Sequence, residues 1–238
     1  MTAPLEAMLD VRGLDAFYGQ AQVVFGVSFR LARGEAVALV GRNGAGKSTT
    51  LKAIMGLVDR HADILEFAGQ DLRALATHRI ARLGLGYVPE ERRIFTDLTV
   101  EENLEVGRLP ARDGRAPWTL LRLYELFPNL AEMAGRSAGR MSGGEQQMLS
   151  IARTLMGNPE VVLLDEPSEG LAPLIVEQMG EAIERMKREG IAILLSEQNL
   201  TFASEIAGRA LLIETGSITF DGPMTELMRS ERLADDGH

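Results

Sequence analysis

The stretch GRNGAGKST at residues 41–49 has the residue types and spacing of a phosphate-binding loop. It follows an apolar run that predicts a strand, and it leads into a pattern of apolar residues at helical spacing. Its three glycines allow backbone amides to converge on phosphate oxygens. Lys47 can then reach the β and γ phosphates of a nucleotide, and Ser48 can supply a Mg²⁺ ligand. The alternative, a glycine turn with a structural role alone, does not explain the strand before it and the helix after it.

Two adjacent carboxylates, Asp165 and Glu166, follow the apolar run VVLL. Neighbouring side chains at the end of a strand point in different directions. One carboxylate can therefore face Mg²⁺ through water while the other polarises an attacking water. Alone, the pair could equally be a helix-capping acid beside a surface acid. The phosphate loop in the same chain favours the catalytic interpretation.

The segment MSGGEQQMLSIARTLMGNP at residues 141–159 predicts a helix with an unusual start. Ser142 is a suitable N-cap and Glu145 completes a capping box. Gly157 and Pro159 are stop signals. Two glycines near the helix start are costly, since glycine loses about 1 kcal/mol relative to alanine inside a helix. We expect them where an anion must approach the backbone.

Four apolar runs, each ending in polar residues, predict the strands that position these groups. They occupy residues 36–41, 85–90, 161–167 and 191–198, and they are nearly unbroken, as expected for strands covered on both faces. The helical segments between them predict an α/β fold with crossover helices. Ligands bind beyond the carboxyl ends of the strands in such sheets, so the four polar ends are expected to line one site.

Antiparallel strands are predicted towards both ends of the chain. MLDVRGLDAFYG and VSFRLARGEAVAL read as strands, with a turn at Arg33-Gly34. RALLIETGSITFDGP predicts a late hairpin that turns near Thr215-Gly216. The final SERLADDGH is expected to be frayed.

Residues 91–158 read as a helical lobe inserted into the α/β core. TVEENLEVG offers a capping box from Thr99 to Glu102, and TLLRLYELF has apolar residues at helical spacing. The loop PARDGRAP at residues 110–117 separates these two helices.

Composition argues against several classes of protein. The 238 residues are 45% hydrophobic, enough for a substantial core, and include no cysteine for disulfides or thiolate chemistry. The formal charge of −9 argues against a broad nucleic-acid surface. No targeting segment or membrane span is predicted, so we expect a cytosolic chain. The histidines His61, His78 and His238 are not clustered with carboxylates, and we expect them on the surface or in loops.

Taken in order, GRNGAGKST, YVPE, MSGGEQQ and LLDEP resemble the motifs of the nucleotide-binding subunit of ABC transporters, over about residues 8–223. YVPE followed by RRIF, LTVEENL, GLAP after DEPSE, and the late EQN are most similar to the ATPases of branched-chain amino-acid importers. The resemblance implies one ABC ATPase domain over residues 8–232, with flexible ends at 1–7 and 233–238. Its α/β fold would be a P-loop NTPase core of the RecA type. An antiparallel β subdomain and the inserted helical subdomain, residues 91–158, would complete it.

The resemblance also assigns roles to individual residues. Glu166 would be the general base. Ser48, Asp165 and Glu90 would position Mg²⁺. The residues implied to bind ATP are Tyr18, Gly41, Asn43, Gly44, Ala45, Gly46, Lys47, Ser48 and Thr49. In this set Tyr18 would stack on adenine, although a lone tyrosine is more often a packing residue.

The resemblance implies an assembly as well. ATP hydrolysis would drive a separate membrane permease at the inner face of the cell membrane, with an external solute-binding protein acting indirectly and no nucleic acid involved. A second ATPase subunit, either a copy or a sister protein, would complete a head-to-tail dimer. The signature residues Ser142, Gly143, Gly144 and Glu145 would face the γ-phosphate bound to the opposite subunit.

Three departures from the general ABC pattern are visible. Glu90 replaces the usual glutamine, Ala-Pro replaces Leu-Asp after DEPSEGL, and Gln198 replaces the usual histidine. Glu90 and Gln198 are therefore candidate catalytic residues of altered type. Glutamine donates and accepts hydrogen bonds but cannot become cationic, so we expect hydrolysis to continue with Glu166 as base. Glu197 and Asn199 read as ordinary solvated residues.

Other classes of protein fit less well. An ABC ATPase of DNA repair or translation usually carries a coiled-coil insertion or two cassettes, and this sequence shows neither. A P-loop kinase or GTPase gives no reason for SGGEQQ. An ATPase of a lipid or lipopolysaccharide exporter, or of a urea or amide importer, shares most of these motifs. The transported solute is therefore left open.

Overall fold

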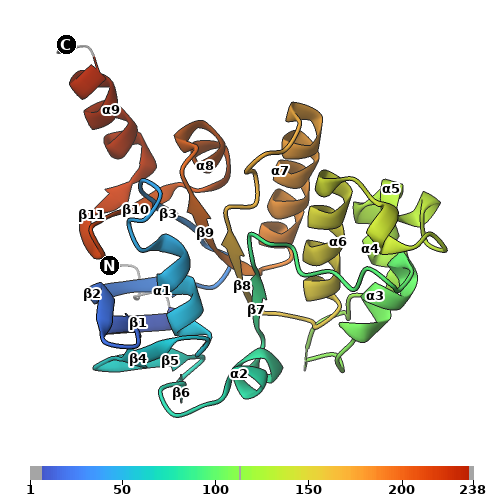
Figure 1. Cartoon of the computed structure of the whole chain (residues 1–238), viewed down its shortest axis with the longest axis horizontal. Helices are drawn as coiled ribbons and strands as arrows, with labels where there is room; N and C mark the ends of the chain where they lie inside the picture. Colours follow the sequence, from blue (N-terminus) through green and yellow to red (C-terminus); the bar gives the residue numbers. More distant parts are fainter. Residues whose placement is uncertain (1–6, 113, 236–238) are drawn as a thin grey trace.

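A six-stranded sheet forms the centre of the computed structural model, which describes residues 7–112 and 114–235 (Figure 1). Its strands are β3 (Ala36–Val40), β7 (Leu85–Val88), β8 (Val161–Asp165), β9 (Ala192–Glu197), β10 (Arg209–Glu214) and β11 (Ser217–Pro223). They are ordered β11-β10-β3-β9-β8-β7. Neighbours from β10 to β7 pair in parallel, and β11 pairs with β10 as the predicted antiparallel hairpin. The four apolar runs therefore lie side by side, so their polar ends meet at one edge.

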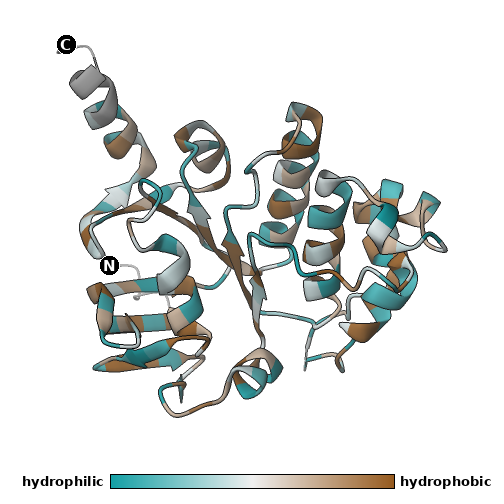
Figure 2. Ribbon diagram, viewed as in Figure 1, coloured by the Kyte–Doolittle hydropathy of each residue, from teal (hydrophilic) through white to brown (hydrophobic). Residues whose placement is uncertain are grey.

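Helices and a second sheet cover the two faces of this central sheet. The helices that do so include α1 (Lys47–Ile54), α6 (Gly143–Leu155), α7 (Pro173–Arg188) and α8 (Leu200–Ile206). Val37 and Leu39 on one face of β3 belong to the core shared with α1 and the second sheet. Ala38 and Val40 on the other face belong to the core shared with α6, α7 and α8. Figure 2 shows the strands as a brown, apolar band between these layers.

The second sheet is antiparallel and packs beside α1 (Figure 1). It contains β1 (Ala7–Tyr18), β2 (Ala21–Ala32), β4 (Asp59–His61), β5 (Ile64–Phe67) and β6 (Gln70–Asp71). The predicted turn at Arg33-Gly34 forms, but β2 and β3 lie in different sheets, so the turn carries the chain from one sheet to the other. The sequence did not predict β4, β5 and β6, which are only two to four residues long.

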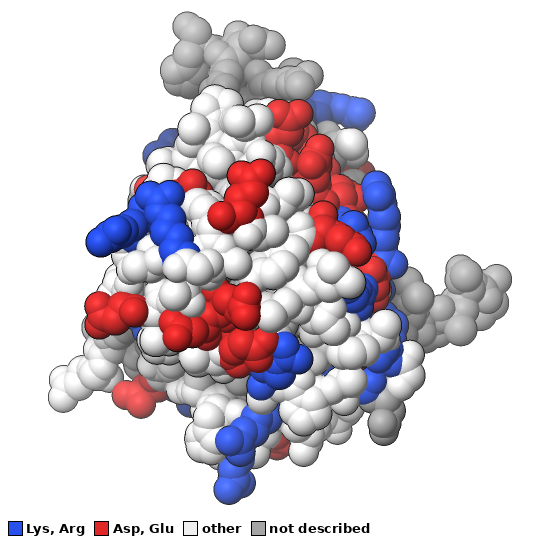
Figure 3. All heavy atoms as spheres, turned by 90° about the vertical axis from the view of Figure 1, so that its right-hand side faces the viewer, with Lys and Arg blue, Asp and Glu red and all other residues white. Residues whose placement is uncertain are grey.

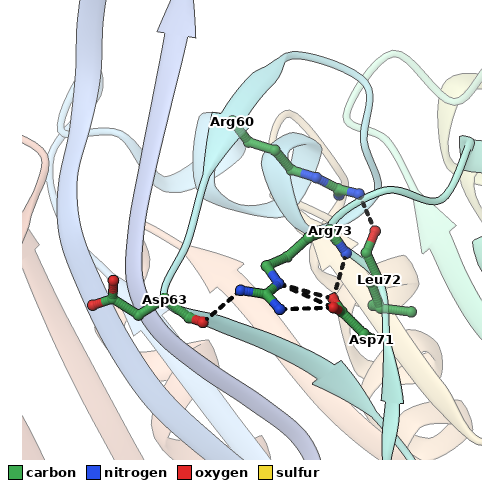
Figure 4. A network of polar contacts seen from close by, with 5 residues as sticks. All are labelled: Arg60, Asp63, Asp71, Leu72 and Arg73. Atoms are coloured by element: carbon green, nitrogen blue, oxygen red, sulfur yellow. Dashed lines mark hydrogen bonds and ion pairs between the residues drawn. The ribbon is translucent and has the colours of Figure 1, made fainter.

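Arg60 and Arg73 belong to a network of polar contacts in the second sheet (Figure 4). Arg60 donates from Nη1 to the carbonyl oxygen of Ile54 in the last turn of α1, at 2.7 Å. Arg73 pairs with Asp71, with Nη2 2.8 Å from Oδ2, and donates to the Asp63 carbonyl oxygen at 2.9 Å. The hydrogen bonds from Arg73 lower the pKa of Asp71 to about 2. Because α1 begins at the phosphate loop, the Arg60 contact ties the helix that carries the site to the second sheet.

The helical lobe comprises α3 (Val100–Val106), α4 (Leu120–Leu126), α5 (Pro128–Glu132) and α6. Both predicted capping boxes form, from Thr99 to Glu102 at α3 and from Ser142 to Glu145 at α6. A capping box satisfies two backbone donors at a helix start, so these starts follow from local sequence alone. Two further helices, α2 (Thr77–Leu83) and α9 (Met224–Asp235), were not predicted individually.

The chain ends are more regular than expected where the structure describes them. Ala7 is the first residue of β1, and residues 230–235, expected to be frayed, continue α9. The rest of the predicted flexible ends, including His238, lies outside the described residues. His61 and His78 are exposed, in β4 and α2. Within residues 7–112 and 114–235, no helix combines the length and apolar character needed to cross a bilayer.

Candidate functional site

The phosphate loop connects the carboxyl end of β3 to the start of α1. Gly46 is the N-cap of α1 and has a φ of 109°, a left-handed conformation that favours glycine. Its carbonyl oxygen accepts from the backbone N–H of Thr50 at 2.9 Å. The side chain of Lys47 folds back into the loop, where Nζ donates to the carbonyl oxygens of Gly41 at 2.8 Å and Arg42 at 3.1 Å. The sequence thus places the lysine ammonium inside the cradle of the loop.

Lys47 also forms a buried ion pair with Glu166. Its Nζ lies 2.9 Å from Glu166 Oε1, and the two side chains are only 3% and 7% exposed. Glu166 has a φ of 46°, which is uncommon for a residue other than glycine, and its N–H donates to the Ser196 carbonyl oxygen at 3.0 Å. This contact to β9 holds the strained backbone that turns the Glu166 carboxylate towards the phosphate loop.

Asp165 faces different partners from its neighbour Glu166. Ser48 Oγ donates to Asp165 Oδ1 at 2.8 Å, and the Tyr87 hydroxyl donates to Asp165 Oδ2 at 3.0 Å. Burial and the nearby Asp165 carboxylate raise the pKa of Tyr87 far above its ordinary value, so the hydroxyl stays protonated. Tyr87 was missed by sequence reasoning, although it lies in the YVPE motif at the end of β7.

A cavity of about 340 Å³ lies between the phosphate loop and Glu90. Glu166, Glu169, Lys47 and Ser48 are among its lining residues. Partial desolvation raises the pKa of Glu90, and neighbouring carboxylates, Glu169 foremost, raise it further. Six polar residues predicted from the sequence therefore border one space, namely Asn43, Lys47, Ser48, Thr49, Glu90 and Glu166.

Gln198 borders a different cavity. This larger space, of about 630 Å³, is lined by Gln198, by the loop residues from Gly41 to Ala45, and by Leu212 and Leu227. Asn43 and Gly44 line both cavities, so the phosphate loop separates them. Gln198 is exposed and lies close to the loop, but it does not line the cavity that contains Glu166.

The expectation that Glu197 is solvated was wrong. Its side chain is buried, with the residue only 1% exposed, and its carboxylate accepts from the N–H groups of Ser168 at 3.1 Å and Asn199 at 3.3 Å. Burial raises the pKa of Glu197 in spite of these hydrogen bonds. Asn199 is exposed as expected and also caps α8, because its Oδ1 accepts from the Phe202 N–H at 3.2 Å. Glu197 thus ties the loop after β8 to the end of β9.

The signature glycines have packing neighbours in the same chain. A Cβ on Gly143 would lie 2.5 Å from Nη1 of Arg92, and one on Gly144 would lie 2.9 Å from the Ile175 side chain. Packing within the chain therefore contributes to the need for glycine, beyond the anion approach expected from the sequence.

The signature and Tyr18 both lie apart from the two cavities. Ser142, Gly143, Gly144 and Glu145 line neither of them. Tyr18, at the end of β1, is 49% exposed and also lines neither.

The sequence profile of one protein family matches residues 24–169, from within β2 to beyond Asp165 and Glu166. That family is the ABC transporter family. The chain belongs to it. The chain is thus an ABC ATPase, an enzyme whose ATP hydrolysis is coupled to transport.

Curated relatives of this ABC ATPase include two named for amino-acid transport. The chain is 41% identical to the high-affinity branched-chain amino acid transport ATP-binding protein BraG of Pseudomonas aeruginosa, over 96% of this chain and 98% of that protein. It is 34% identical to the probable branched-chain amino acid transport ATP-binding protein LivF of Archaeoglobus fulgidus, over 95% and 96%. The lipopolysaccharide export system ATP-binding protein LptB of Escherichia coli is 34% identical, over 95% of both chains.

Solved structures share the fold of this ABC ATPase. An ATP-binding subunit of an ABC transporter superposes with a TM-score of 0.78 at 28% identity, covering 95% of this chain and 94% of that one. An ATP-binding cassette solved in its ADP conformation superposes with a TM-score of 0.79 at 22% identity, covering 96% and 97%. The P-loop core with its antiparallel sheet and helices is therefore the fold that the sequence predicted.

Proposed function

We propose that this ABC ATPase powers a separate membrane permease that imports branched-chain or related amino acids. The relative of highest identity named above, BraG, and the LivF relative carry that activity in their names, and both match nearly the whole chain. An alternative is the ATPase of a lipopolysaccharide or lipid exporter, which the likeness to LptB supports. A urea or amide importer is a further alternative within the importer class.

The buried contact between Lys47 and Glu166 carries the catalytic part of the proposal. Lys47 neutralises Glu166 in the structure, with Nζ 2.9 Å from Oε1. The β and γ phosphates of ATP would attract the lysine away from this carboxylate. Glu166 would then be free to accept a proton from the attacking water. Binding of ATP would in this way release the base that hydrolyses it.

Ser48 and Asp165, with Glu90 across the cavity, are the proposed Mg²⁺ residues. A serine hydroxyl and carboxylates are oxygen donors, which suit this hard cation, and Ser48 Oγ already lies 2.8 Å from Asp165 Oδ1. Bound Mg²⁺ would neutralise charge on the phosphate oxygens during transfer. The protonated Tyr87 hydroxyl, 3.0 Å from Asp165 Oδ2, would keep this carboxylate oriented.

Three further groups complete the proposed ATP site. The exposed ring of Tyr18 would stack on adenine. Gln198, beside the phosphate loop, would hydrogen-bond the γ-phosphate or the attacking water in place of histidine. The signature residues Ser142 to Glu145 would bind the γ-phosphate held by a second ATPase subunit. Their separation from the cavities of their own chain is consistent with such a head-to-tail dimer.

The surface that follows Glu90 is the proposed docking site for the permease. Phe95 is 47% exposed, and the Arg153 guanidinium lies 4.9 Å above its ring. Asn103 fixes the Phe95 backbone, accepting from its N–H and donating to its carbonyl oxygen, both at 2.9 Å. A fixed, exposed aromatic ring is a suitable anchor for a partner helix. The side of the molecule in Figure 3, which the helical lobe occupies, carries both acidic and basic side chains, which suits a protein partner better than nucleic acid.

Charge reversal tests this docking surface. Reversing Glu91, Arg92 and Arg93 together is expected to weaken copurification with the permease. Reversal of Glu226 and Arg229, exposed on α9, serves as a control for charge reversal at another surface. Full permease binding by the first variant would count against the assignment.

The assembly would place the chain at the inner face of the cell membrane, with an external solute-binding protein delivering the solute to the permease. We also propose that residues 8–232 act as one ATPase domain, with residues 91–158 as its inserted helical subdomain.

Transport by the copurified complex is the decisive experiment for the substrate. Reconstituted in vesicles, it should take up leucine, isoleucine or valine in the presence of ATP, and the Glu166→Gln variant should not. ATP-dependent movement of lipopolysaccharide, or uptake of urea or amides without branched-chain amino acids, would replace the proposed solute by one of the alternatives.

A further inference from the structure

Gln147 is a buried amide without a hydrogen-bond partner. It lies in the first part of α6, the residue is 2% exposed, and its side-chain oxygen and nitrogen have no partner among the residues that the structure describes. Leaving a buried amide unpaired is costly, so few native side chains are found in this state. An apolar residue of the same size would fill the position without that cost.

The amide borders a cavity that contains the proposed catalytic base. This space, of about 200 Å³, is lined by Gln147 on the helical lobe and by Glu90, Arg92, Glu166, Pro167 and Glu169. Gln147 is thus a neutral donor and acceptor, facing carboxylates across a space large enough for the side chains to move.

The ion pair between Lys47 and Glu166 gives a reason for an unpaired amide beside the Glu166 carboxylate. Glu166 is 7% exposed and its charge is balanced by Lys47. When phosphate takes the lysine, the carboxylate becomes a buried charge without its partner, which is strongly unfavourable. We propose that Gln147 is a positioning residue, whose side-chain N–H donates to the Glu166 carboxylate once ATP has drawn Lys47 away. The inference rests on the proposed function in taking Lys47 as the phosphate ligand and Glu166 as the base.

An amide suits this task better than the charged group beside it. Arg92 lines the same cavity, and its guanidinium packs against Gly143 at the start of α6. Paired with Glu166, a guanidinium would neutralise the carboxylate and weaken it as a base. The amide of Gln147 orients the carboxylate and leaves its charge available. It also makes the orientation of the base depend on the position of α6, the helix that begins with the signature residues.

Replacing Gln147 by methionine separates this role from a structural one. Methionine has nearly the same shape and no unpaired polar group, so the thermal midpoint of the nucleotide-free Gln147→Met protein is expected to be unchanged or higher. Its kcat for ATP hydrolysis is expected to fall about tenfold, the value of one hydrogen bond to a charged group, with KM for ATP within about twofold of wild type. Gln146→Met is the matched control, because the Gln146 amide is already bonded to the Met141 carbonyl oxygen at 3.1 Å. The control should lose no turnover.

The opposite results overturn the proposal. Unchanged kcat in Gln147→Met, or a fall in kcat that merely follows a lower thermal midpoint, would assign the residue to packing alone. Should methionine prevent folding, Gln147→Asn retains the amide but withdraws it by one carbon. That variant is expected to lower kcat with KM unchanged, and wild-type kcat in it would also overturn the proposal.

Two backgrounds identify the partner of the amide. Gln147→Met should still lower kcat about tenfold when Arg92 is replaced by methionine. If it no longer lowered kcat in that background, Gln147 would act through Arg92. In a Glu166→Gln background, Gln147→Met should not lower kcat further, because the carboxylate that Gln147 would orient is absent. If Glu166→Gln itself hydrolyses ATP at the wild-type rate, the proposed function fails; if it is inactive while Gln147→Met is fully active, only the positioning role fails.

Discussion

The ammonium of Lys47 lies 2.9 Å from the carboxylate of Glu166, and both side chains are almost completely buried. The ion pair thus joins the phosphate loop to the residue after Asp165. Removing one member of a buried ion pair leaves the other charged and desolvated, which destabilises the fold. Removing both members can leave the free energy of unfolding nearly unchanged.

Lys47→Met should therefore destabilise the nucleotide-free protein by about 3 kcal/mol, as measured by urea unfolding. The double variant Lys47→Met with Glu166→Gln should recover most of this loss. Lys52→Met, in the same helix, is the control for removal of a lysine that is not in the pair. Equal stability of the single and double variants would show that an unpaired Glu166 carboxylate does not destabilise the fold, contrary to this prediction. ATP binding should be lost in both Lys47 variants.

Tyr87 provides a test of how Asp165 is oriented. Tyr87→Phe removes the hydroxyl that donates to Asp165 Oδ2 at 3.0 Å and retains the ring. We expect the half-saturating concentration of Mg²⁺ to rise about tenfold, since one hydrogen bond to a charged group is lost. Affinity for Mn²⁺ in the presence of ATP, measured by electron paramagnetic resonance, should weaken to the same extent. Nucleotide binding without metal should not change, and a weakened metal-free affinity would indicate damage to the loop instead.

The sequence predicts what depends on local pattern and misses what depends on contacts between strands. The four core strands and both capping boxes follow from apolar runs and from residues three positions apart, and the structure confirms them. The hydroxyl of Tyr87 reaches Asp165 only because β7 and β8 pair, and nothing near Tyr87 in the sequence indicates this.

The burial of individual polar side chains was also not predictable from the sequence. Glu197 was expected to be solvated because it follows an apolar run, yet the N–H groups of Ser168 and Asn199 hold its carboxylate inside the protein. The sequence assigns no role to Gln147, because its burial and its neighbours in the cavity depend on the fold. The strands β4 to β6 are too short for a periodic pattern and depend on pairing with β1 or with one another.

Glu197 gives the protein a predictable response to pH. Burial raises the pKa of this carboxyl group in the folded protein above its value in the unfolded chain. The unfolded chain therefore loses the proton at lower pH, and folded-state stability falls as pH rises through the interval between the two values. Glu197→Gln should lack this contribution, so its thermal midpoint relative to wild type should increase from pH 4 to pH 7. A constant difference across that range would mean that Glu197 does not titrate as its burial implies.

Gln198 tests the departure from the common histidine. Gln198→His should leave ATP affinity intact and change the hydrolysis rate by about tenfold at most, in either direction, because one neutral hydrogen bond is exchanged for one that can be charged. Steady-state ATPase assays with equilibrium nucleotide binding measure both quantities. Complete loss of turnover would show that the site beside the phosphate loop is organised differently.

Glu166 is the proposed base, which ATP binding would release from Lys47. The most direct measurement compares wild type with Glu166→Gln, each purified with its partner subunits, for ATP binding and for hydrolysis. We predict that the variant binds ATP with at least wild-type affinity and hydrolyses it about 100-fold more slowly or worse. Hydrolysis by the variant at the wild-type rate would show that Glu166 is not the base.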